Sequence, residues 1–223
     1  EENSIKCVMS YLSPDMEENY PGNLDCKVIY ELNNNNEILI NFQAISDQDT
    51  LVNLTNHNYW NFHGHGVHYQ NNEDHVVHIN SNSICETDEQ SIPTGKIINI
   101  EDTKFNLKNE FLISKEFLNS GGIDHNYVLK DQSMGESAAK IYSKKTGMGV
   151  EYFTNQHGIQ FYTGNMMLDK YIGKYNKVYG PQYGLCLEPQ HYPDAVNHSN
   201  FPSPILRKNN KYISKIKIKL RNN

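Results

Sequence analysis

The sequence predicts an all-β sandwich, and three observations support this fold class. Apolar and polar residues alternate over residues 24–32, four asparagines follow at 33–36, and alternation resumes over residues 38–44. This pattern is typical of an antiparallel hairpin with one buried face. Many short apolar segments bounded by turn residues come next. Helical periodicity is almost absent, and we expect only a turn or two of helix within residues 103–118.

The other expected strands are short, as in most sandwiches. They cover residues 5–11, 52–54, 75–80, 97–100, 127–130, 138–144, 149–153, 159–163, 185–187 and 212–220. We find neither an internal repeat nor a linker that would divide the chain. Because 223 residues can bury one sizeable core, residues 1–223 are predicted to form a single domain.

Composition restricts the class of ligand. The net charge is −6, and only two arginines occur, Arg207 and Arg221. Such a chain offers no basic face to nucleic acid, and planar recognition of a phosphate usually recruits arginine. We therefore expect an uncharged small-molecule ligand, no nucleic-acid or membrane partner, and a monomer or weak homodimer. No apolar run of about 18 residues and no signal peptide is visible, so a cytoplasmic protein is expected.

Cysteine and histidine spacing bears on metal binding. The four cysteines show no CxxC spacing, and we expect reduced core thiols rather than disulfides or a zinc site; they are Cys7, Cys26, Cys85 and Cys186. A metal-dependent β-sandwich enzyme is one alternative, since histidine is a common zinc ligand. The histidines that suggest it are His63, His65, His68, His75 and His78. No carboxylate or cysteine accompanies them at a helpful spacing.

In the stretch GLCLEPQHYPDAVN (residues 184–197), the apolar strand expected at residues 185–187 delivers one carboxylate, Glu188, at its end. Pro189 is expected to turn the chain there, and Pro193 limits how far the following loop can relax. The residues alone leave open whether Glu188 caps a turn, joins a surface ion pair or does chemistry.

Two further stretches concentrate polar groups. NLTNHNYWNF (residues 53–62) places His57 before Tyr59 and Trp60. Because histidine titrates near neutrality, this has the makings of a general acid beside an aromatic stacking surface, although a structural histidine in a polar turn is the alternative. In GGIDHNY (residues 121–127), Asp124 either caps a turn or hydrogen-bonds sugar hydroxyl groups.

These stretches resemble, in the same order, motifs of the aldose 1-epimerase (galactose mutarotase) family. Residues 184–197 resemble GxCLExQxxPDAxN, and residues 53–62 resemble NLTNHxYFNL, with Trp60 in place of phenylalanine. Residues 124–127 resemble DHNF. Residues 154–165, TNQHGIQFYTGN, resemble TxxPGxQFYTGN, with His157 in place of proline. Collinear similarity from Ser13 to Phe201 covers nearly the whole chain.

The resemblance implies a galactose-mutarotase-like supersandwich that interconverts the α and β anomers of a free hexose such as galactose or glucose. It implies that Glu188 is the catalytic base and His57 the catalytic acid, and that Asp124 and Gln160 bind the substrate. Tyr59 or Trp60 is expected to stack on the sugar. No metal or organic cofactor is implied. We expect Glu188 to be partly buried with a raised pKa, as a base working at neutral pH requires.

The family also has an upstream Asn-Arg pair and a Leu-His-Gly-Gly motif, and neither occurs in this sequence. FHGHG (residues 62–66) follows the His57 stretch directly, so that motif's role is not transferred to His63 or His65. The chain is therefore expected to be a C-terminal portion of the family's fold without its N-terminal strands. The alternative function is a non-catalytic carbohydrate-binding protein of the same fold. A scaffold role without a ligand has no sequence feature in its favour.

Overall fold

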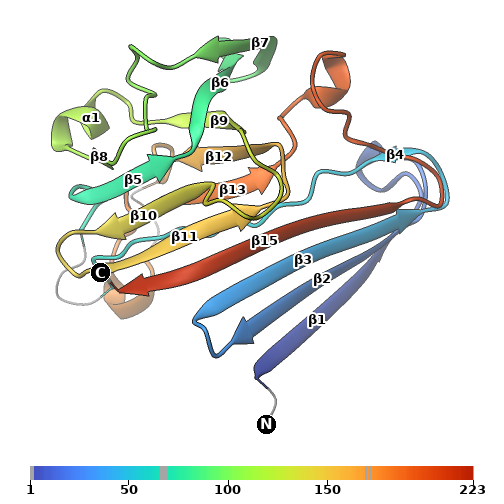
Figure 1. The fold of residues 1–223 in the computed structure, drawn as a ribbon, viewed down its shortest axis with the longest axis horizontal. Coiled ribbons are helices and arrows are strands. Elements are labelled where there is room, and N and C mark those ends of the chain that lie inside the picture. The colour runs from blue at the N-terminus through green and yellow to red at the C-terminus, as the bar shows by residue number, and fades with distance from the viewer. Residues whose placement is uncertain (1–2, 66–69, 169, 171, 223) are drawn as a thin grey trace.

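The computed structural model describes residues 3–65, 70–168, 170 and 172–222. In this part of the chain, the strands form an eight-stranded sheet, a five-stranded sheet and a two-stranded ribbon (Figure 1). Every pair of neighbouring strands runs antiparallel. The expected all-β antiparallel fold class is thus confirmed.

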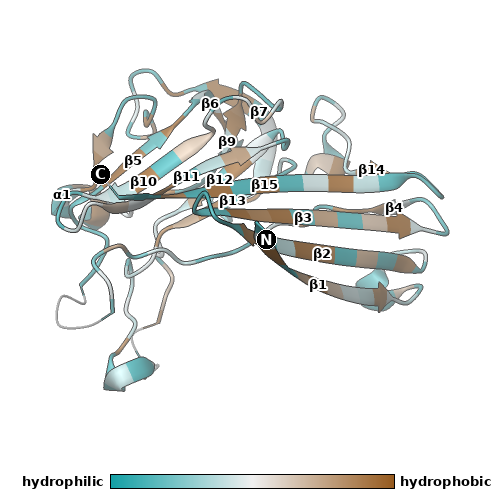
Figure 2. Ribbon diagram, turned by 60° about the horizontal axis from the view of Figure 1, so that its bottom comes forward, coloured by the Kyte–Doolittle hydropathy of each residue, from teal (hydrophilic) through white to brown (hydrophobic). Residues whose placement is uncertain are grey.

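The larger sheet takes its strands from both ends and the middle of the chain. Its spatial order is β1 (Ser4–Ser13), β2 (Leu24–Asn33), β3 (Glu37–Ser46), β15 (Lys211–Asn222), β11 (Met148–Thr154), β10 (Ala139–Ser143), β5 (His75–Ile79) and β8 (Phe111–Leu112). Side chains of β15 alternate between exposed and buried positions over most of its length, as its repeated lysine–isoleucine pairs predict. Figure 2 shows hydrophilic and hydrophobic residues following one another along this strand.

The smaller sheet lies over the β5–β10–β11 side of the larger one (Figure 1). Its order is β13 (Cys186–Gln190), β12 (Gly158–Tyr162), β9 (Asp124–Leu129), β6 (Ser81–Thr87) and β7 (Pro93–Asn99). The ribbon pairs β4 (Thr50–Leu51) with β14 (Ile205–Leu206). The helical segments described are α1 (Lys115–Asn119) and the 3₁₀ turns η1 (Glu17–Asn19), η2 (Lys174–Asn176) and η3 (Ala195–Asn197).

The core lies between the two sheets. Fully buried residues from β11 and β12, such as Tyr152 and Phe161, belong to one apolar cluster with Tyr127 of β9. One face of the five-stranded sheet is thereby committed to the core, which leaves its other face free to carry a site. No helix described in the structure is long and apolar enough to cross a membrane.

Most expected strands are confirmed, including the hairpin of β2 and β3 with its turn at residues 34–36. The expected strand at residues 52–54 is wrong: the ladder stops at Leu51, and the chain beyond it is held by single bonds such as Leu54 N to the Tyr212 hydroxyl. All four cysteines are free, but Cys7 is exposed on the outer strand β1 instead of lying in the core.

Candidate active site

Glu188 sits in the middle of β13 rather than at its end. The strand continues through Pro189 to Gln190, so the expected turn at Pro189 is wrong. The physical reason is the position of β13 at the edge of its sheet, where a proline without an N–H removes no bond from a neighbouring ladder. Glu188 is therefore fixed by a regular strand.

Strand alternation gathers polar side chains on the free face of this sheet. Cys186, Glu188 and Gln190 share that face, and Glu188 pairs directly with Gln160 on β12. Asp124 on β9 lies within reach, since it accepts a 2.7 Å hydrogen bond from Gln160 Nε2. The other amide atom, Gln160 Oε1, is buried and has no hydrogen-bond partner among the described atoms, which leaves an acceptor for a ligand hydroxyl.

His57 reaches this face because residues 53–60 dock along β13. The Thr55 hydroxyl donates to the Pro189 carbonyl at 2.7 Å, and the backbones of Trp60 and Leu185 exchange two bonds of 2.8 Å. The contact is close enough that a Cβ at Gly184 would lie 2.9 Å from the Tyr59 ring. Residues 53–60, which form no regular strand, are thus held at fixed positions beside β13, the strand that carries Glu188.

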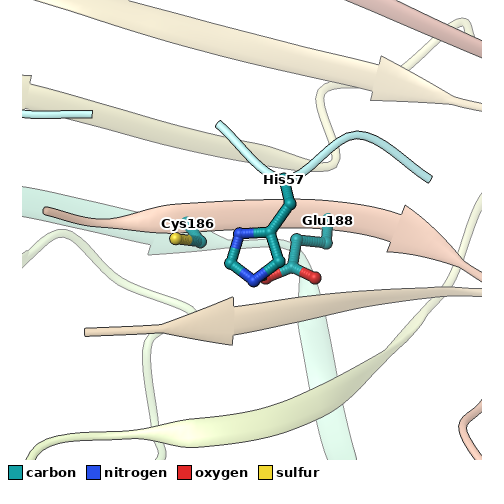
Figure 3. Close-up of side chains that lie close together, drawn as sticks. All are labelled: His57, Cys186 and Glu188. Carbon is teal, nitrogen blue, oxygen red and sulfur yellow. The ribbon is translucent and has the colours of Figure 1, made fainter. Parts of the chain in front are cut away.

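The two residues that the family resemblance singles out meet at this point. His57 Nε2 lies 3.4 Å from Glu188 Oε1 (Figure 3), with 49% of the histidine side chain exposed against 10% of the glutamate. The Tyr59 ring stacks on the imidazole with centroids 4.9 Å apart and planes 15° apart. A buried carboxylate thus faces an accessible imidazole that is held from one side.

Electrostatics favour proton transfer at Glu188. Burial, and then the nearby charge of Asp124, raise the pKa of Glu188 to about 7. The expected raised pKa is thus confirmed, and the side chain is more deeply buried than predicted. Burial and the same carboxylates also raise the pKa of the Cys186 thiol, so the thiol stays protonated at neutral pH.

His57, Glu188 and the polar residues around them line a pocket of about 440 Å³, a size suited to a small molecule. Its described lining contains two carboxylates and no lysine or arginine, which disfavours an anionic ligand. The lining residues are His57, Tyr59, Asp124, Gln160, Tyr162, Met166, Met167, Glu188, Gln190 and Pro193. A larger hollow of about 510 Å³ lies elsewhere, but its one carboxylate, Asp194, is already bonded to Asn197 and His198. Volume alone would therefore select a hollow whose carboxylate is already paired.

The structure brings together five of the six residues predicted for the site. Trp60 is the sixth, and it is not among the described residues that line this pocket: its indole packs against the core and donates a 2.7 Å hydrogen bond to the Tyr152 hydroxyl. Sequence reasoning missed Tyr162, Met166 and Met167. Tyr162 could have been found, since it follows Gln160 by two residues in an expected strand and so shares its face.

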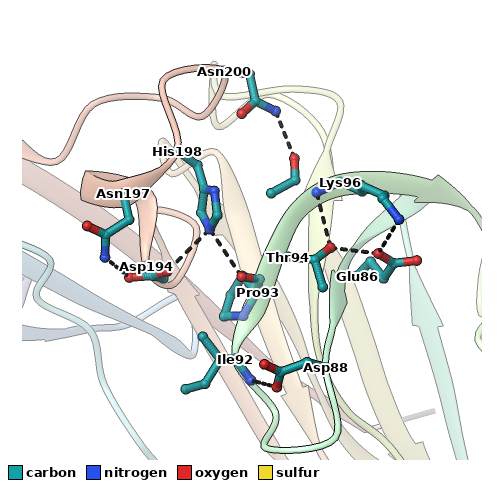
Figure 4. A network of polar contacts seen from close by, with 11 residues as sticks. Glu86, Asp88, Ile92, Pro93, Thr94, Lys96, Asp194, Asn197, His198 and Asn200 are labelled. Atoms are coloured by element: carbon teal, nitrogen blue, oxygen red, sulfur yellow. Dashed lines mark hydrogen bonds and ion pairs between the residues drawn. The ribbon is translucent and has the colours of Figure 1, made fainter.

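The loop after β13 is anchored to the β6–β7 hairpin. His198 Nε2 lies 3.1 Å from the Pro93 carbonyl and 3.2 Å from Asp194 Oδ2 (Figure 4). Gly95 permits this approach, because it has a φ of +85° and a Cβ there would lie 2.6 Å from His198 Nδ1. The Asn200 amide adds a 2.9 Å bond to the Gly95 carbonyl. These bonds fix the loop that contributes Pro193 to the pocket.

The histidine-based metal site is not supported. Buried His63 and His75 do touch, with ring centroids 4.3 Å apart, but both nitrogens of each ring already have partners. His65 and His78 join no group of three metal-binding side chains, and His68 lies outside the described residues. Within the described chain, the single such group is His57, Cys186 and Glu188.

Comparison with known proteins gives a consistent assignment. The sequence profile named aldose 1-epimerase matches residues 1–219. The chain is 38% identical over 205 residues to galactose mutarotase of Homo sapiens, covering 91% of this chain and 59% of that protein. It is 30% identical over 222 residues to aldose 1-epimerase of Escherichia coli K12, covering 96% and 63%.

Solved structures agree in fold. An aldose epimerase homologue from C. elegans superposes with a TM-score of 0.87 at 24% identity, covering 97% of this chain and 66% of the other. Galactose 1-epimerase from Lactobacillus acidophilus NCFM gives 0.82 at 24% identity, covering 99% and 64%. The chain therefore belongs to the aldose 1-epimerase family. It spans about 59% of the length of the mammalian relatives that it matches.

Proposed function

We propose that this chain carries the acid–base pair of an aldose 1-epimerase and interconverts the α and β anomers of a free hexose such as galactose or glucose. The observation that carries the proposal is the 3.4 Å approach of His57 Nε2 to Glu188 Oε1 inside a pocket lined by hydroxyl-binding side chains. Family membership and the names of the relatives add support.

In the proposed reaction, ionised Glu188 accepts the proton of the anomeric hydroxyl while His57 donates a proton to the ring oxygen. The bond between C1 and the ring oxygen breaks, which leaves an open-chain aldehyde. Rotation about the C1–C2 bond presents the other carbonyl face, and reclosure returns both protons in the reverse direction. Acid and base assistance each contribute roughly 10²–10⁴-fold, enough for a reaction that already proceeds in water.

The remaining pocket residues orient the sugar in this proposal. Asp124 accepts hydrogen bonds from substrate hydroxyls, and the unpartnered Gln160 Oε1 accepts another. Half-exposed Tyr59 offers its ring edge and outer face to the apolar side of the sugar. All these groups come from one chain, so we propose that a monomer or weak homodimer suffices.

Polarimetry tests the proposal. Freshly dissolved α-D-galactose or α-D-glucose should reach rotational equilibrium faster with the protein, and Glu188→Gln or His57→Ala should remove most of the acceleration. The matched control is Glu86→Gln, which changes a half-buried carboxylate paired with Lys96 outside the pocket. Sugar binding without acceleration would favour the carbohydrate-binding alternative, and full activity in Glu188→Gln would refute the assignment.

A further inference from the structure

The proposed chemistry gives no role to Cys186, which lies beside the pocket. Cys186 is fully buried and lies two residues before Glu188 on the same face of β13. Its sulfur, a His57 ring nitrogen and a Glu188 carboxylate oxygen all lie within 4.8 Å of one another (Figure 3). Three different ligand types therefore converge beside the pocket.

This set has the chemistry of a zinc site. Zinc is held by thiolate, imidazole and carboxylate, and sites with three protein ligands leave a fourth position open. Two ligands bound tetrahedrally to one zinc, at roughly 2.0–2.2 Å each, lie about 3.4 Å apart. The His57–Glu188 distance is 3.4 Å. Bringing the sulfur into the same shell needs side-chain shifts of about 1 Å, which half-exposed His57 can accommodate.

The surroundings also favour a cation. Asp124 adds a second carboxylate, and no lysine or arginine is among the described residues that line the pocket. The sulfur ligand selects thiophilic ions over magnesium or calcium, which prefer oxygen. Binding replaces the S–H bond of Cys186 with a metal–sulfur bond and releases one proton to solvent, so the affinity should rise with pH.

We propose that a thiophilic divalent cation, represented by Zn²⁺, binds His57, Cys186 and Glu188 and inhibits the anomerisation. The inhibitory part rests on the proposed function. A zinc ion bound to Glu188 and His57 occupies the Glu188 lone pair that would accept the anomeric proton and the His57 nitrogen that would carry the proton exchanged with the ring oxygen. Metal binding and proton transfer at this pair are therefore mutually exclusive.

Cobalt absorption tests the site independently of activity. Chelator-treated and dialysed protein should develop a near-ultraviolet cobalt–thiolate band that saturates at about one Co²⁺ per chain and disappears when Zn²⁺ displaces cobalt. Cys186→Ser should abolish the band, and His57→Gln should weaken cobalt binding about tenfold or more. Cys85→Ser is the matched control, because Cys85 is also buried but belongs to no group of three metal-binding side chains among the described residues. Absence of the band, or its persistence in Cys186→Ser, would overturn the metal site.

Polarimetry then tests inhibition, with each variant compared with its own rate in chelator. Added Zn²⁺ should slow the wild-type protein in parallel with cobalt displacement, and chelator should restore the rate. Cys186→Ser should need at least about tenfold more Zn²⁺ for the same inhibition. An unchanged or faster rate with bound Zn²⁺ would overturn the inhibitory role. No acceleration even in chelator would instead refute the proposed function, while the cobalt spectrum would still decide the metal site.

Discussion

Replacing Glu188 by glutamine should stabilise the fold at alkaline pH, and the size of the effect follows from its burial. The native state raises the pKa of this carboxyl from 4.5 to about 7, so the native state binds its proton more tightly than the unfolded chain does. The contribution of Glu188 to the free energy of unfolding is therefore greatest below pH 4.5 and falls as the pH rises toward and through 7. A shift of this size corresponds to about 3 kcal/mol of native-state stability lost once Glu188 is ionised.

Glutamine has nearly the same shape and carries no charge, so the variant escapes this loss. Measured by urea unfolding, the free energy of unfolding of Glu188→Gln should exceed that of the wild type by up to about 3 kcal/mol at pH 8. This difference should shrink steadily toward pH 5. The figure is an upper limit, because half-exposed His57 lies 3.4 Å away and solvent reaches the pair. A difference that stays constant between pH 5 and 8, or that favours the wild type at pH 8, would refute the reasoning.

Glu151→Gln is the control with the opposite sign. Burial opposes ionisation of Glu151, but hydrogen bonds and ion pairs with Arg221 and Lys140 keep the pKa of its carboxyl below the ordinary value. Its charge is therefore stabilising at every pH above that ordinary value, and stability is lost only in more acidic solution. The variant should be destabilised by the same amount across pH 5–8, which separates the two carboxylates in one experiment.

Three further predictions concern the proposed activity, all measured in chelator. First, kcat/KM for hexose anomerisation should fall as the pH drops below about 7, because Glu188 must be ionised to accept a proton; a flat profile down to pH 5 would contradict this. Second, Asp124→Asn should raise KM and move that acid limb to lower pH, since it removes a charge that raises the Glu188 pKa; an unmoved limb would show that this charge has no influence. Third, Thr55→Val should lower kcat by about 10- to 100-fold at constant KM, because it deletes the bond to the Pro189 carbonyl that holds the His57 segment. Thr94→Val, which deletes a bond to Glu86 outside the pocket, should leave kcat unchanged.

Regular alternation made much of the fold predictable. Alternation with a period of two predicts which side chains of a strand are buried and which are exposed. It applies to the lysine–isoleucine repeat of residues 215–220 and to the hairpin at residues 24–44, and both are found as expected in β15 and the β2–β3 pair. The same rule links Gln160 to Tyr162, so part of the pocket lining was accessible from sequence.

Other features depend on tertiary contacts that no local pattern encodes. The strand through Pro189 is possible only because β13 lies at a sheet edge, which sequence does not reveal. Trp60 lies outside a regular strand, so no period predicts that its indole turns into the core while Tyr59 faces the pocket. Met166 and Met167 enter the site from an irregular loop for the same reason.

The approach of His57 to Glu188 was predicted by resemblance and not by spacing. The two residues are 131 positions apart, and each taken alone fits a structural role. Docking of residues 53–60 on β13 brings them together, through bonds such as Thr55 to the Pro189 carbonyl. The resemblance therefore predicted the pair, and the docking contacts explain how two residues so distant in sequence come within 3.4 Å of each other.

The most direct test of the acid–base pair is saturation transfer between the anomeric protons of galactose at equilibrium, followed by nuclear magnetic resonance. Irradiating the α-anomeric proton in the presence of the protein should diminish the β-anomeric signal, because ring opening and reclosure exchange the two populations. Glu188→Gln should remove this transfer while the sugar still binds. Equal transfer in the wild type and in Glu188→Gln, or none in the wild type, would contradict the assignment of Glu188 as the base.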